Sequence, residues 1–312
     1  MSDGFVFHSN RASSVYEAAL QPLGGRPYRE GGREIDLLYF CDYGGKQKPQ
    51  VERIGFELVD RRLTVPIDNK KQMAELLRSF GINRPRVYFN PQDVPAIPDV
   101  LWYVKNPLAS AAKDLACVPA QSVASVFREG DVIQEAITRL HLLNARKYTI
   151  RAYVLYYAGR AWLFSEGVLV VHAREYHEDD ASPETQYLHA GYERQDSEVK
   201  MLKLSQHPLY LAVMESLKHT LGRAFKAFLT LLNQGAPNSY CLFGIDLLLE
   251  ESLNAVLIEV NDRPNIAHTP QINSAVSVPL VQAMAALLMP TLEPGLPWPR
   301  PDFVLLAGGA SG

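Results

Sequence analysis

The stretch from residue 241 to residue 264, CLFGIDLLLEESLNAVLIEVNDRP, constrains the fold more than any other part of the sequence. Two apolar runs lie on either side of a short polar segment, residues 251–254. This pattern predicts a β-hairpin, because strand-forming residues flank turn-forming ones. If the loop is symmetric, Glu250 faces Ala255 across the hairpin. The same register brings two acidic residues of opposite strands together.

These two acidic residues are Asp246 and Glu259, which share one patch of the predicted hairpin. Asn261 points to the same face, because side chains alternate along a strand, and its neighbour Gly244 leaves open space there. Like charges directly opposite each other destabilise a sheet. Protonation, pairing with a Lys or Arg, or a bound cation would relieve the repulsion. Because Mg²⁺ shared with phosphate prefers oxygen ligands, Asp246, Glu259 and Asn261 are candidate metal ligands.

Composition restricts the class of protein. The 312 residues are 47% hydrophobic and 21% charged, as in ordinary globular proteins. A net charge of −3 gives no overall attraction to nucleic acid or to an anionic membrane, so neither partner is expected. Three scattered cysteines, and the lack of a leader-like N-terminus or an uninterrupted apolar run of about 20 residues, predict a cytoplasmic protein. The histidines form no HExxH motif, which argues against a zinc enzyme.

Strand-forming and helix-forming segments divide the chain into predicted lobes. Residues 1–66 read as a small α/β lobe that recognises substrate, with a helix near residues 13–20. An amphipathic helix opens after Asn69 and is stopped by Gly81. The further divisions are residues 67–132, residues 133–290, and a loose proline-rich tail at residues 291–312.

A long core helix is predicted in the C-terminal half. Apolar residues recur there at helical spacing. They are Leu209, Val213, Leu217, Leu221, Phe225 and Phe228. A second helix is expected from about Val278 to Leu288.

The order of these elements resembles the ATP-grasp superfamily and, within it, the tubulin–tyrosine ligase-like family. The segment FGIDLLLEESLNAVLIEVNDRP is similar to the family pattern FGxDxxxDxxxxxWLxEVNxxP, with the same separation of Asp and Glu. The resemblance covers residues 68–288 or so. It implies an α+β class and an ATP-grasp fold, in which a nucleotide is held between two α/β lobes beside the small N-terminal α/β lobe.

Two further segments imply roles for individual cations. WYVKNP resembles the family's WIxKP, which implies that Lys105 contacts nucleotide phosphate, and Lys113 stands in the place of a second phosphate-binding lysine. RKYTIRAYVL is similar to KFDxRxYVL. This likeness places Lys147 on the adenine side and assigns Arg151 to the terminal phosphate or the substrate carboxylate.

The hinge and the substrate side are implied in the same way. VIQEAI resembles the hinge VxQxYI, whose backbone reads the adenine edge. The hinge residues are Gln134, Glu135, Ala136 and Ile137. Val170 falls where the pattern RxGxxR has a second arginine. His172 and Arg174, with Arg263 of the NDRP segment, are candidate substrate-binding residues.

Two other positions depart from the family pattern. The phosphate loop NPLASAAKDL lacks the usual glycines, which restricts its backbone. Thr149 stands where the family has an aspartate that contacts ribose.

The resemblance implies an ATP- and Mg²⁺-dependent ligase that joins a carboxylate to an amine, such as an amino acid, through an acyl phosphate. The carboxylate substrate would be a peptide, an acidic protein tail or a small molecule. Two alternatives are a phosphotransferase on the same scaffold and a nucleotide-binding interaction module with little turnover. An acidic acceptor would be recognised by the loop at residues 177–200 and by a basic stretch. That stretch comprises Arg61, Arg62, Lys70 and Lys71.

Overall fold

The computed structural model describes residues 4–42, 45–108, 114–187, 198–290 and 302–308. In this part of the chain, strands form one sheet of eleven strands and one of four. The main path of the large sheet runs in space through β12 (Lys200–Lys203), β11 (Val168–Val171), β9 (Tyr148–Tyr157), β13 (Ser239–Leu249), β4 (Arg53–Leu58), β3 (Glu34–Tyr39), β1 (Val6–Ser9) and β2 (Arg26–Pro27).

Three more strands extend the large sheet beside this path. They are β14 (Ala255–Asn261), which pairs with β13, and β10 (Arg160–Phe164), which pairs with β9 and with β15 (Phe303–Gly308). The strands of the N-terminal region pair in parallel and join the rest through β4 and β13. The predicted α/β character of residues 1–66 therefore holds, and these strands continue the large sheet. The division into domains stays a prediction.

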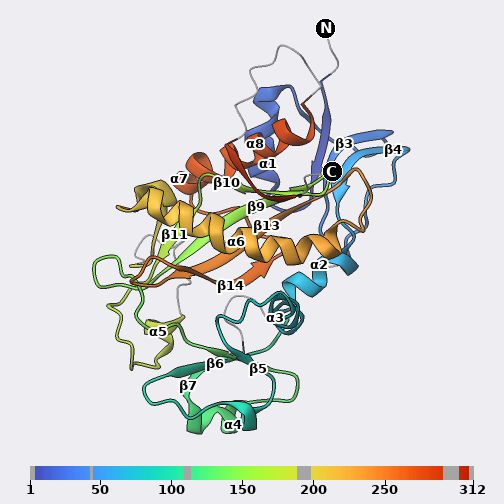
Figure 1. The fold of residues 1–312 in the computed structure, drawn as a ribbon. Helices are drawn as coiled ribbons and strands as arrows, with labels where there is room; N and C mark the ends of the chain where they lie inside the picture. Colours follow the sequence, from blue (N-terminus) through green and yellow to red (C-terminus); the bar gives the residue numbers. More distant parts are fainter. Residues whose placement is uncertain (1–3, 43–44, 109–113, 188–197, 291–301, 309–312) are drawn as a thin grey trace.

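The small sheet is antiparallel and lies apart from the large one (Figure 1). Its spatial order is β5 (Val87–Tyr88), β8 (Val132–Glu135), β6 (Leu101–Lys105) and β7 (Leu115–Pro119). The short helix α4 (Val123–Val126) packs on its outer face, where Trp102 and Ile133 are buried. The inner face, which carries Tyr103 and Lys105, is turned towards the large sheet.

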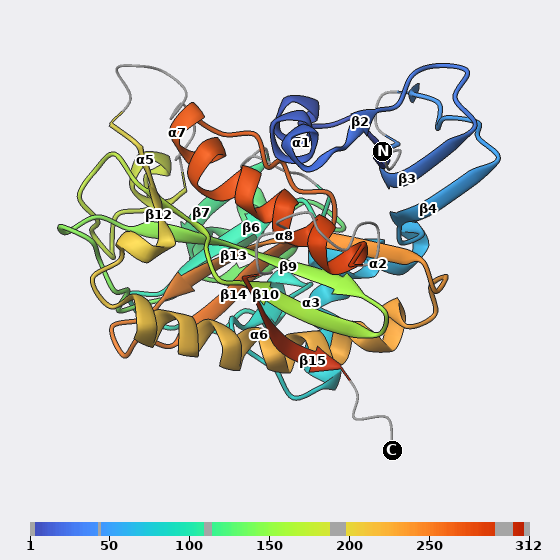
Figure 2. The ribbon, with the colours of Figure 1, turned by 90° about the horizontal axis from the view of Figure 1, so that it is seen from above.

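Two helical layers cover the large sheet. Helix α6 (Tyr210–Leu232) lies on one face, and α1 (Ser13–Leu20) and α8 (Val278–Leu288) lie on the other (Figures 1 and 2). The sheet is thus apolar on both sides, which explains why β9 and β13 read as continuous hydrophobic runs. The predicted bounds of α1 and α8 are confirmed.

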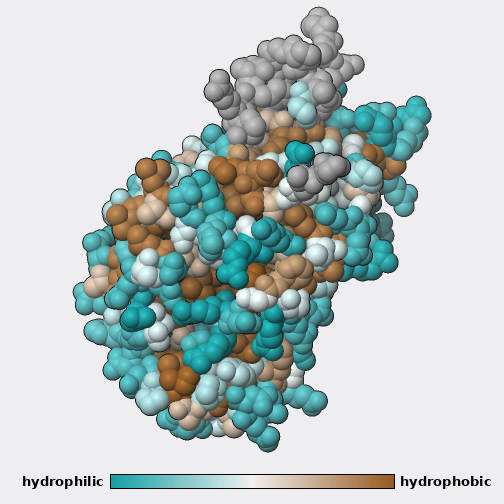
Figure 3. Space-filling view, in the orientation of Figure 1, coloured by the Kyte–Doolittle hydropathy of each residue, from teal (hydrophilic) through white to brown (hydrophobic). Residues whose placement is uncertain are grey.

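Helix α6 confirms the predicted apolar stripe with one correction. Val213 and the apolar residues that follow it at helical spacing are buried, but Leu209 is 44% exposed. Leu209 precedes the first residue of the helix. It therefore does not share the helical spacing that places the other apolar residues against the sheet. Leu211 is also exposed, and Figure 3 shows apolar surface over this end of α6.

Helices α2 (Arg61–Asp68) and α3 (Lys70–Ser79) connect the two sheets, and α3 lies between them (Figure 1). The Asn69 side chain accepts hydrogen bonds from the N–H groups of Lys71 and Gln72 and so caps α3. Gly81, with φ of 71°, follows the end of the helix. The predicted start and stop of this helix are therefore confirmed.

The segment after β14 is more helical than its sequence suggests. It comprises α7 (Pro270–Ile272), a π-helical turn (Asn273–Ser277) and α8. By length and hydropathy alone this 19-residue segment could cross a membrane. Because α8 packs against α1 in the second core, as a core helix does, this is weak evidence for a span.

The C-terminal tail is ordered where it was expected to be loose. Strand β15 pairs antiparallel with β10, and Ala307 is buried against the core that α6 covers. The expectation is therefore wrong for residues 303–308, because the apolar run FVLLAG completes an otherwise open sheet edge. Residues 291–301 and 309–312 lie outside the described residues.

Candidate active site

The acid hairpin forms as β13 and β14. Asp246 pairs with Glu259, and Gly244 pairs with Asn261, so the register expected for the acidic residues is confirmed. The space at Gly244 is filled, contrary to expectation. A Cβ built there would lie 2.7 Å from the Cβ of Pro264 and 3.2 Å from an Arg151 nitrogen.

The turn of this hairpin differs from the expected symmetric one. Ala255 pairs with Leu249 and not with Glu250, so the register near the turn is offset by one residue. A β-bulge at Ile258 then cancels this offset, so that Glu259 pairs with Asp246 as expected. The bulge also interrupts the alternation of side chains along β14. As a result Ile258 and Glu259, which are consecutive, both line the same cleft.

Each carboxylate of the hairpin lies against a cation. Nε and Nη2 of Arg151 donate to the two oxygens of Asp246 at 2.6 and 2.9 Å, since β9 places Arg151 directly opposite Asp246. Lys70 Nζ lies 3.4 Å from Glu259 Oε1. Burial alone would lower the pKa of Arg151, but the Asp246 carboxylate outweighs it and raises that pKa. Ionic pairing thus neutralises both acids. We call these four residues the acid end.

The donor set of the hairpin is suited to a magnesium ion. Among the described residues, no group of three or more His, Cys, Asp or Glu could by itself hold a metal ion, so the third donor would have to be an amide oxygen. The Asn261 amide nitrogen donates to Gly244 O at 3.4 Å, which leaves the side-chain oxygen for a ligand. Two carboxylates and one amide oxygen are the hard ligands that Mg²⁺ prefers.

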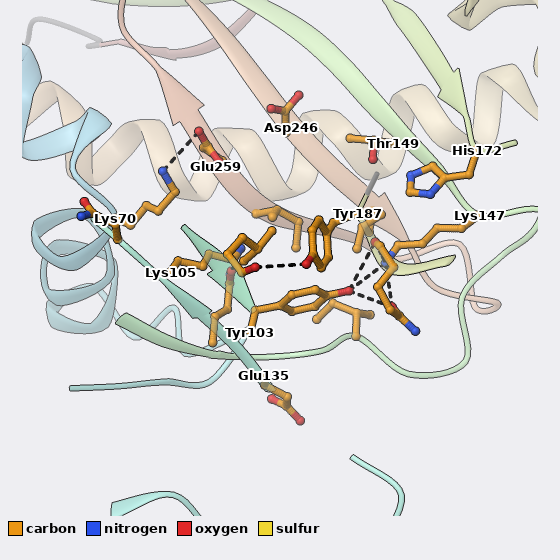
Figure 4. A pocket seen from close by; sticks show the side chains of 17 residues that line it. Lys70, Tyr103, Lys105, Glu135, Lys147, Thr149, His172, Tyr187, Asp246 and Glu259 are labelled. Carbon is orange, nitrogen blue, oxygen red and sulfur yellow. Dashed lines mark hydrogen bonds and ion pairs between the residues drawn. The ribbon is translucent and has the colours of Figure 1, made fainter. Parts of the chain in front are cut away.

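A cleft of about 870 Å³, partly open to solvent, lies between the small sheet and the hairpin (Figure 4). Its lining includes eight of the candidate site residues, and also Lys70 of the basic stretch and Thr149. The eight are Lys105, Gln134, Glu135, Ile137, Lys147, His172, Asp246 and Glu259. Segments far apart in the chain therefore converge on one cavity.

The end of the cleft opposite the acid end is rich in tyrosine. Buried Lys147 donates from Nζ to Tyr103 OH at 3.0 Å and to the Gln186 backbone oxygen at 2.8 Å. Lys105 donates to the Gln134 side-chain oxygen. Burial lowers the pKa of Lys147 to about 7 and that of Lys105 to about 8. We call Lys105, Lys147 and the groups around them the tyrosine end.

Neither of these two lysines forms an ion pair with a carboxylate in the part of the chain that the structure describes. A buried ammonium surrounded only by neutral oxygens and aromatic rings is costly. Nζ of Lys105 and of Lys147 lie 5.2 and 5.5 Å from the centre of the Tyr103 ring. Lys147 therefore brings an amine to the cleft without a carboxylate close to it, whereas the more distant carboxylate of Glu259 partly offsets the charge of Lys105.

Apolar walls complete this end, and sequence reasoning missed them. They are Tyr103, Leu115, Tyr187, Leu248 and Ile258. Strand periodicity could have indicated two of them. Tyr103 precedes Lys105 by two residues, and Leu248 follows Asp246 by two, so each shares a strand face with a predicted site residue.

Comparison with protein families decides the classification. The model of the tubulin-tyrosine ligase family matches residues 70–294, which is more than half of the chain. The chain belongs to this family. It is therefore a member of the ATP-grasp superfamily, and its mixed α/β architecture is consistent with that fold. Membership indicates ATP-dependent amide-bond ligase activity in general terms. A search of curated proteins gave no match.

In this member of the tubulin-tyrosine ligase family, the hinge residues differ in which of their polar groups face the cleft. The Glu135 carboxylate accepts hydrogen bonds from Arg86 at 2.7 and 3.0 Å, and Figure 4 shows its side chain directed away from the cleft. The Ala136 N–H donates to Leu101 O at 2.9 Å and is already engaged. Gln134, by contrast, turns its side chain inward to Lys105.

Several expected site residues lie beside the cleft or away from it. Arg151, which contacts Asp246, and Asn261, which pairs with Gly244, do not line the cleft. Arg174 is exposed, whereas His172 is buried and lines the cleft near Thr149. Lys113 lies outside the described residues. The roles that the family resemblance assigned to these residues stay predictions.

Arg263 occupies a structural position. Its guanidinium is buried and donates to Val59 O and Asp262 O, both at 3.0 Å, which ties the end of β4 to the segment after β14. It does not line the cleft. A substrate contact for Arg263 stays a prediction, and its observed contacts are all within the chain.

Proposed function

We propose that this protein is an ATP-dependent carboxylate–amine ligase that forms an amide bond through an acyl phosphate. One observation carries the proposal. Half-buried Lys105 and buried Lys147, which form no ion pair with a carboxylate among the described residues, share one cleft with the acid pair Asp246 and Glu259. A polyphosphate chain with a divalent cation is the ligand whose charges match both ends of such a cleft.

In this proposal the adenine base lies at the tyrosine end. The apolar side chains of Leu115, Leu248 and Ile258 fit the faces of a planar ring, and Tyr187 closes the slot. Lys147 would lie beside the base and Lys105 beside the phosphate chain. Asp246, Glu259 and Asn261 would hold Mg²⁺, which offsets phosphate charge.

The proposed chemistry transfers the terminal phosphoryl group of ATP to a substrate carboxylate. A carboxylate oxygen bonds to the γ-phosphorus, and the bond from that phosphorus to the bridging oxygen breaks, which releases ADP. The amine then attacks the carbonyl carbon of the acyl phosphate, loses a proton and displaces inorganic phosphate. No nucleophilic side chain is needed, because the site contributes charge and position.

Lys70 and Arg151 are the cations nearest to the acid pair. They neutralise the two carboxylates by direct contact. An anionic ligand competes with these carboxylates for Lys70 and Arg151. The positive charge of the two cations then becomes available to the phosphoryl group that is transferred. Preorganised contacts of this kind are each worth on the order of 3 kcal/mol in a transition state.

Hydroxylamine trapping tests this proposal. The protein is incubated with ATP, Mg²⁺, hydroxylamine and pools of peptide and small carboxylates, and hydroxamates, ADP and AMP are measured. We expect hydroxamate together with ADP and phosphate, and neither with Glu259→Gln. Release of AMP and pyrophosphate would replace the acyl phosphate with an adenylate. ADP with a stable phosphorylated product would indicate a phosphotransferase, and nucleotide binding without turnover would indicate an interaction module.

A further inference from the structure

A short segment after β11 joins the large sheet to the small sheet at the tyrosine end of the cleft. We call residues 180–187, which include the short helix α5 (Pro183–Gln186), the clasp. The clasp follows a strand of the large sheet, yet its last residue, Tyr187, packs against the buried cluster of the small sheet that contains Tyr103. The Tyr187 hydroxyl also donates to the backbone oxygen of Leu115 at 3.0 Å. The clasp therefore ties the two sheets together beside the cleft.

Hydrogen bonds within the clasp hold its conformation. The Asp180 carboxylate accepts from the N–H and the hydroxyl of Ser182 at 2.8 and 2.9 Å, and from the Thr185 hydroxyl at 2.6 Å. Gln186 donates from Nε2 to the backbone oxygen of Asp180 at 2.7 Å. This last contact decides the orientation of the amide. Because its nitrogen is engaged within the clasp, its oxygen, Oε1, is the atom that faces the small sheet.

Gln186 presents two oxygens to the tyrosine end. Its Oε1 accepts from the Tyr103 hydroxyl at 2.8 Å and from Lys147 Nζ at 3.3 Å, and its backbone oxygen accepts from the same Nζ at 2.8 Å. Lys147 also donates to the Tyr103 hydroxyl oxygen at 3.0 Å (Figure 4). The three donors of the ammonium are therefore all engaged, two of them by Gln186. Gln186 is only 2% exposed and lines the cleft.

The other groups that face Lys147 contribute little to its charge. They are Tyr103 and Lys105 of β6, the Cys117 thiol of β7 and the ring of Tyr176. The positive charge of Lys105 disfavours the Lys147 ammonium. Burial raises the pKa of the Cys117 thiol to about 11, so this thiol is neutral at neutral pH. The two oxygens of Gln186 are therefore the main acceptors that stabilise the ammonium.

One of these contacts is well suited to replacement by a ligand. The contact from Lys147 Nζ to Gln186 Oε1 is long for a hydrogen bond, and a neutral oxygen holds an ammonium less tightly than a carboxylate does. An acceptor atom of a nucleotide can therefore take the place of Oε1, while Tyr103 continues to hold the amide. A carboxylate in this position would form an ion pair that the nucleotide would have to break.

We propose that Gln186 is a positioning residue for the nucleotide: it orients the Lys147 ammonium towards the base and stabilises its charge until an acceptor atom of the nucleotide replaces Oε1. Gln186 acts through Lys147 and takes no part in the transfer of the phosphoryl group. This inference rests on the proposed function, because it concerns the nucleotide end of the same cleft.

Recognition of an acidic acceptor by the basic stretch and by the loop at residues 177–200 stays a prediction. The basic stretch does not form one surface, because Arg62 pairs with Asp60 at 2.6 Å, whereas Lys70 turns into the cleft. The clasp is the part of the loop that lies at the tyrosine end. Residues 188–197 lie outside the described residues.

Direct titration of Lys147 tests the role of Gln186 without turnover. The lysines of the full chain are labelled with ¹³C at Cε, and NMR follows their signals from about pH 5.5 to about pH 10. The Lys147 signal is identified by its loss in Lys147→Met. Calorimetry then measures the Kd of ADP with Mg²⁺ over the same pH range.

Two variants change the Oε1 contact in opposite directions. Gln186→Met removes the oxygen and nearly keeps the size of the side chain, so the pKa of Lys147 should fall by about half a unit to one unit. Gln186→Glu places a carboxylate beside the ammonium, so that pKa should rise by about one unit or more. The matched control is Gln234→Met, the same change at an exposed position just after α6 that does not line the cleft.

The two variants should also differ in how nucleotide affinity depends on pH. In Gln186→Met, ADP affinity should begin to fall at a lower pH and be about threefold to tenfold weaker at pH 7.5. In Gln186→Glu, ADP should bind about tenfold more weakly at pH 6.5, because the new ion pair must be broken, and the affinity should change less with pH. Both variants should raise the KM for ATP more than they lower kcat.

An unchanged pKa of Lys147 in both variants would overturn the assignment even where ADP binds more weakly, because Gln186 would then act on the fold or on the nucleotide directly. Changes of the same size in Gln234→Met would overturn it as well. If Gln186→Met does not melt as a folded protein, Gln186→Glu decides the matter alone.

The inference and the proposed function fail separately. Opposite changes in the pKa of Lys147 in the two variants, without ADP binding or hydroxamate formation by the natural protein, would retain Gln186 as the residue that positions Lys147 and reject the ligase. Hydroxamate formation by the natural protein, with the same pKa of Lys147 in all forms, would retain the ligase and reject the role of Gln186.

Discussion

The acid end and the tyrosine end of the cleft hold their positive charge in different ways. At the acid end, Arg151 and Lys70 contact the carboxylates of Asp246 and Glu259. At the tyrosine end, the contacts found for Lys105 and Lys147 are with neutral oxygens and rings. The first arrangement is balanced within the protein. The second is costly without a ligand, because burial disfavours an ammonium that has no carboxylate in direct contact with it.

This difference explains why the pKa shifts of the two ends have opposite directions. Burial would lower the pKa of all buried cations. At Arg151 the adjacent carboxylate reverses the effect, whereas at Lys105 and Lys147 burial prevails. We infer that the acid end is set up by folding and that the tyrosine end is completed by the nucleotide. Five predictions test this contrast.

The largest effect is expected from Glu259→Gln at the acid end. The amide keeps the shape of the side chain but loses the charge that would hold Mg²⁺ and position Lys70. Mg²⁺-dependent ADP formation should fall by about 10²-fold to 10³-fold, with melting temperature little changed. The control is Glu251→Gln in the exposed turn of the same hairpin. Full activity in Glu259→Gln would show that the acid end is not a metal site.

The next effect is expected from Arg151→Gln, in both activity and stability. Removal of the guanidinium leaves Asp246 without its partner in a largely buried position, which costs on the order of 3 kcal/mol in the free energy of unfolding. Turnover at saturating ATP should fall as well. Urea unfolding measures the first effect. Arg33→Gln, which breaks an exposed pair with Glu52, should cost much less stability. If the two variants lose equal stability, the acid end is not balanced by this pair.

At the tyrosine end, Lys147→Met should separate affinity from stability. A charge-assisted contact with nucleotide is lost, so the KM for ATP should rise by about tenfold or more while kcat changes less. Because burial disfavours the ammonium, the apo-protein should not be less stable than the natural one. Kinetics and thermal melting, with exposed Lys200→Met as the control, measure both. A marked loss of stability would show that Lys147 is compensated within the protein after all.

The smallest effect is a pH dependence confined to the tyrosine end. Lys147 and Lys105, with pKa values of about 7 and about 8, lose their charge as pH rises from 6 to 9. ATP should therefore bind more weakly at pH 9 than at pH 6.5, and binding at pH 7.5 should take up protons. Calorimetry in buffers of different ionisation enthalpy measures the uptake. Proton release, or none, would contradict the assigned shifts.

The same lysines give a linked effect on stability, whose sign is opposite to that on binding. Between their folded pKa values and the ordinary lysine pKa of 10.5, the unfolded chain binds more protons than the folded chain does. Their contribution to the free energy of unfolding therefore rises with pH in that window. Unfolding of the apo-protein at several pH values, compared with Lys147→Met, isolates this contribution.

In the hairpin, the sequence pattern predicted the pairing of the acidic residues correctly although it predicted the turn wrongly. Alternation and the polar loop placed Asp246 opposite Glu259, which is confirmed. The expected pairing of Glu250 with Ala255 is wrong, and the bulge at Ile258 compensates for the offset. A bulge leaves little trace in a single sequence, because it depends on how the strand meets its neighbours.

Contacts between distant segments were beyond the sequence pattern. Lys70 reads as part of an exposed basic stretch, yet the position of α3 between the sheets brings it to Glu259. Gln134 was assigned a backbone role, yet its side chain contacts Lys105. Arg263 reads as a site residue and is buried in contacts with the main chain.

The sequence by itself determined the local elements of this protein. Helical and strand periods, the Asn69 cap, Gly81 and the acid hairpin are encoded within short windows, where propensity and side-chain alternation act. Only the tertiary structure decided which cations contact a carboxylate and which lie in the cleft without one. That outcome depends on burial and on partners far apart in the chain, such as Arg151 with Asp246, and on their absence around Lys147 among the described residues. Electrostatic energy depends on the distance between charges and on their desolvation, and a short stretch of sequence contains neither.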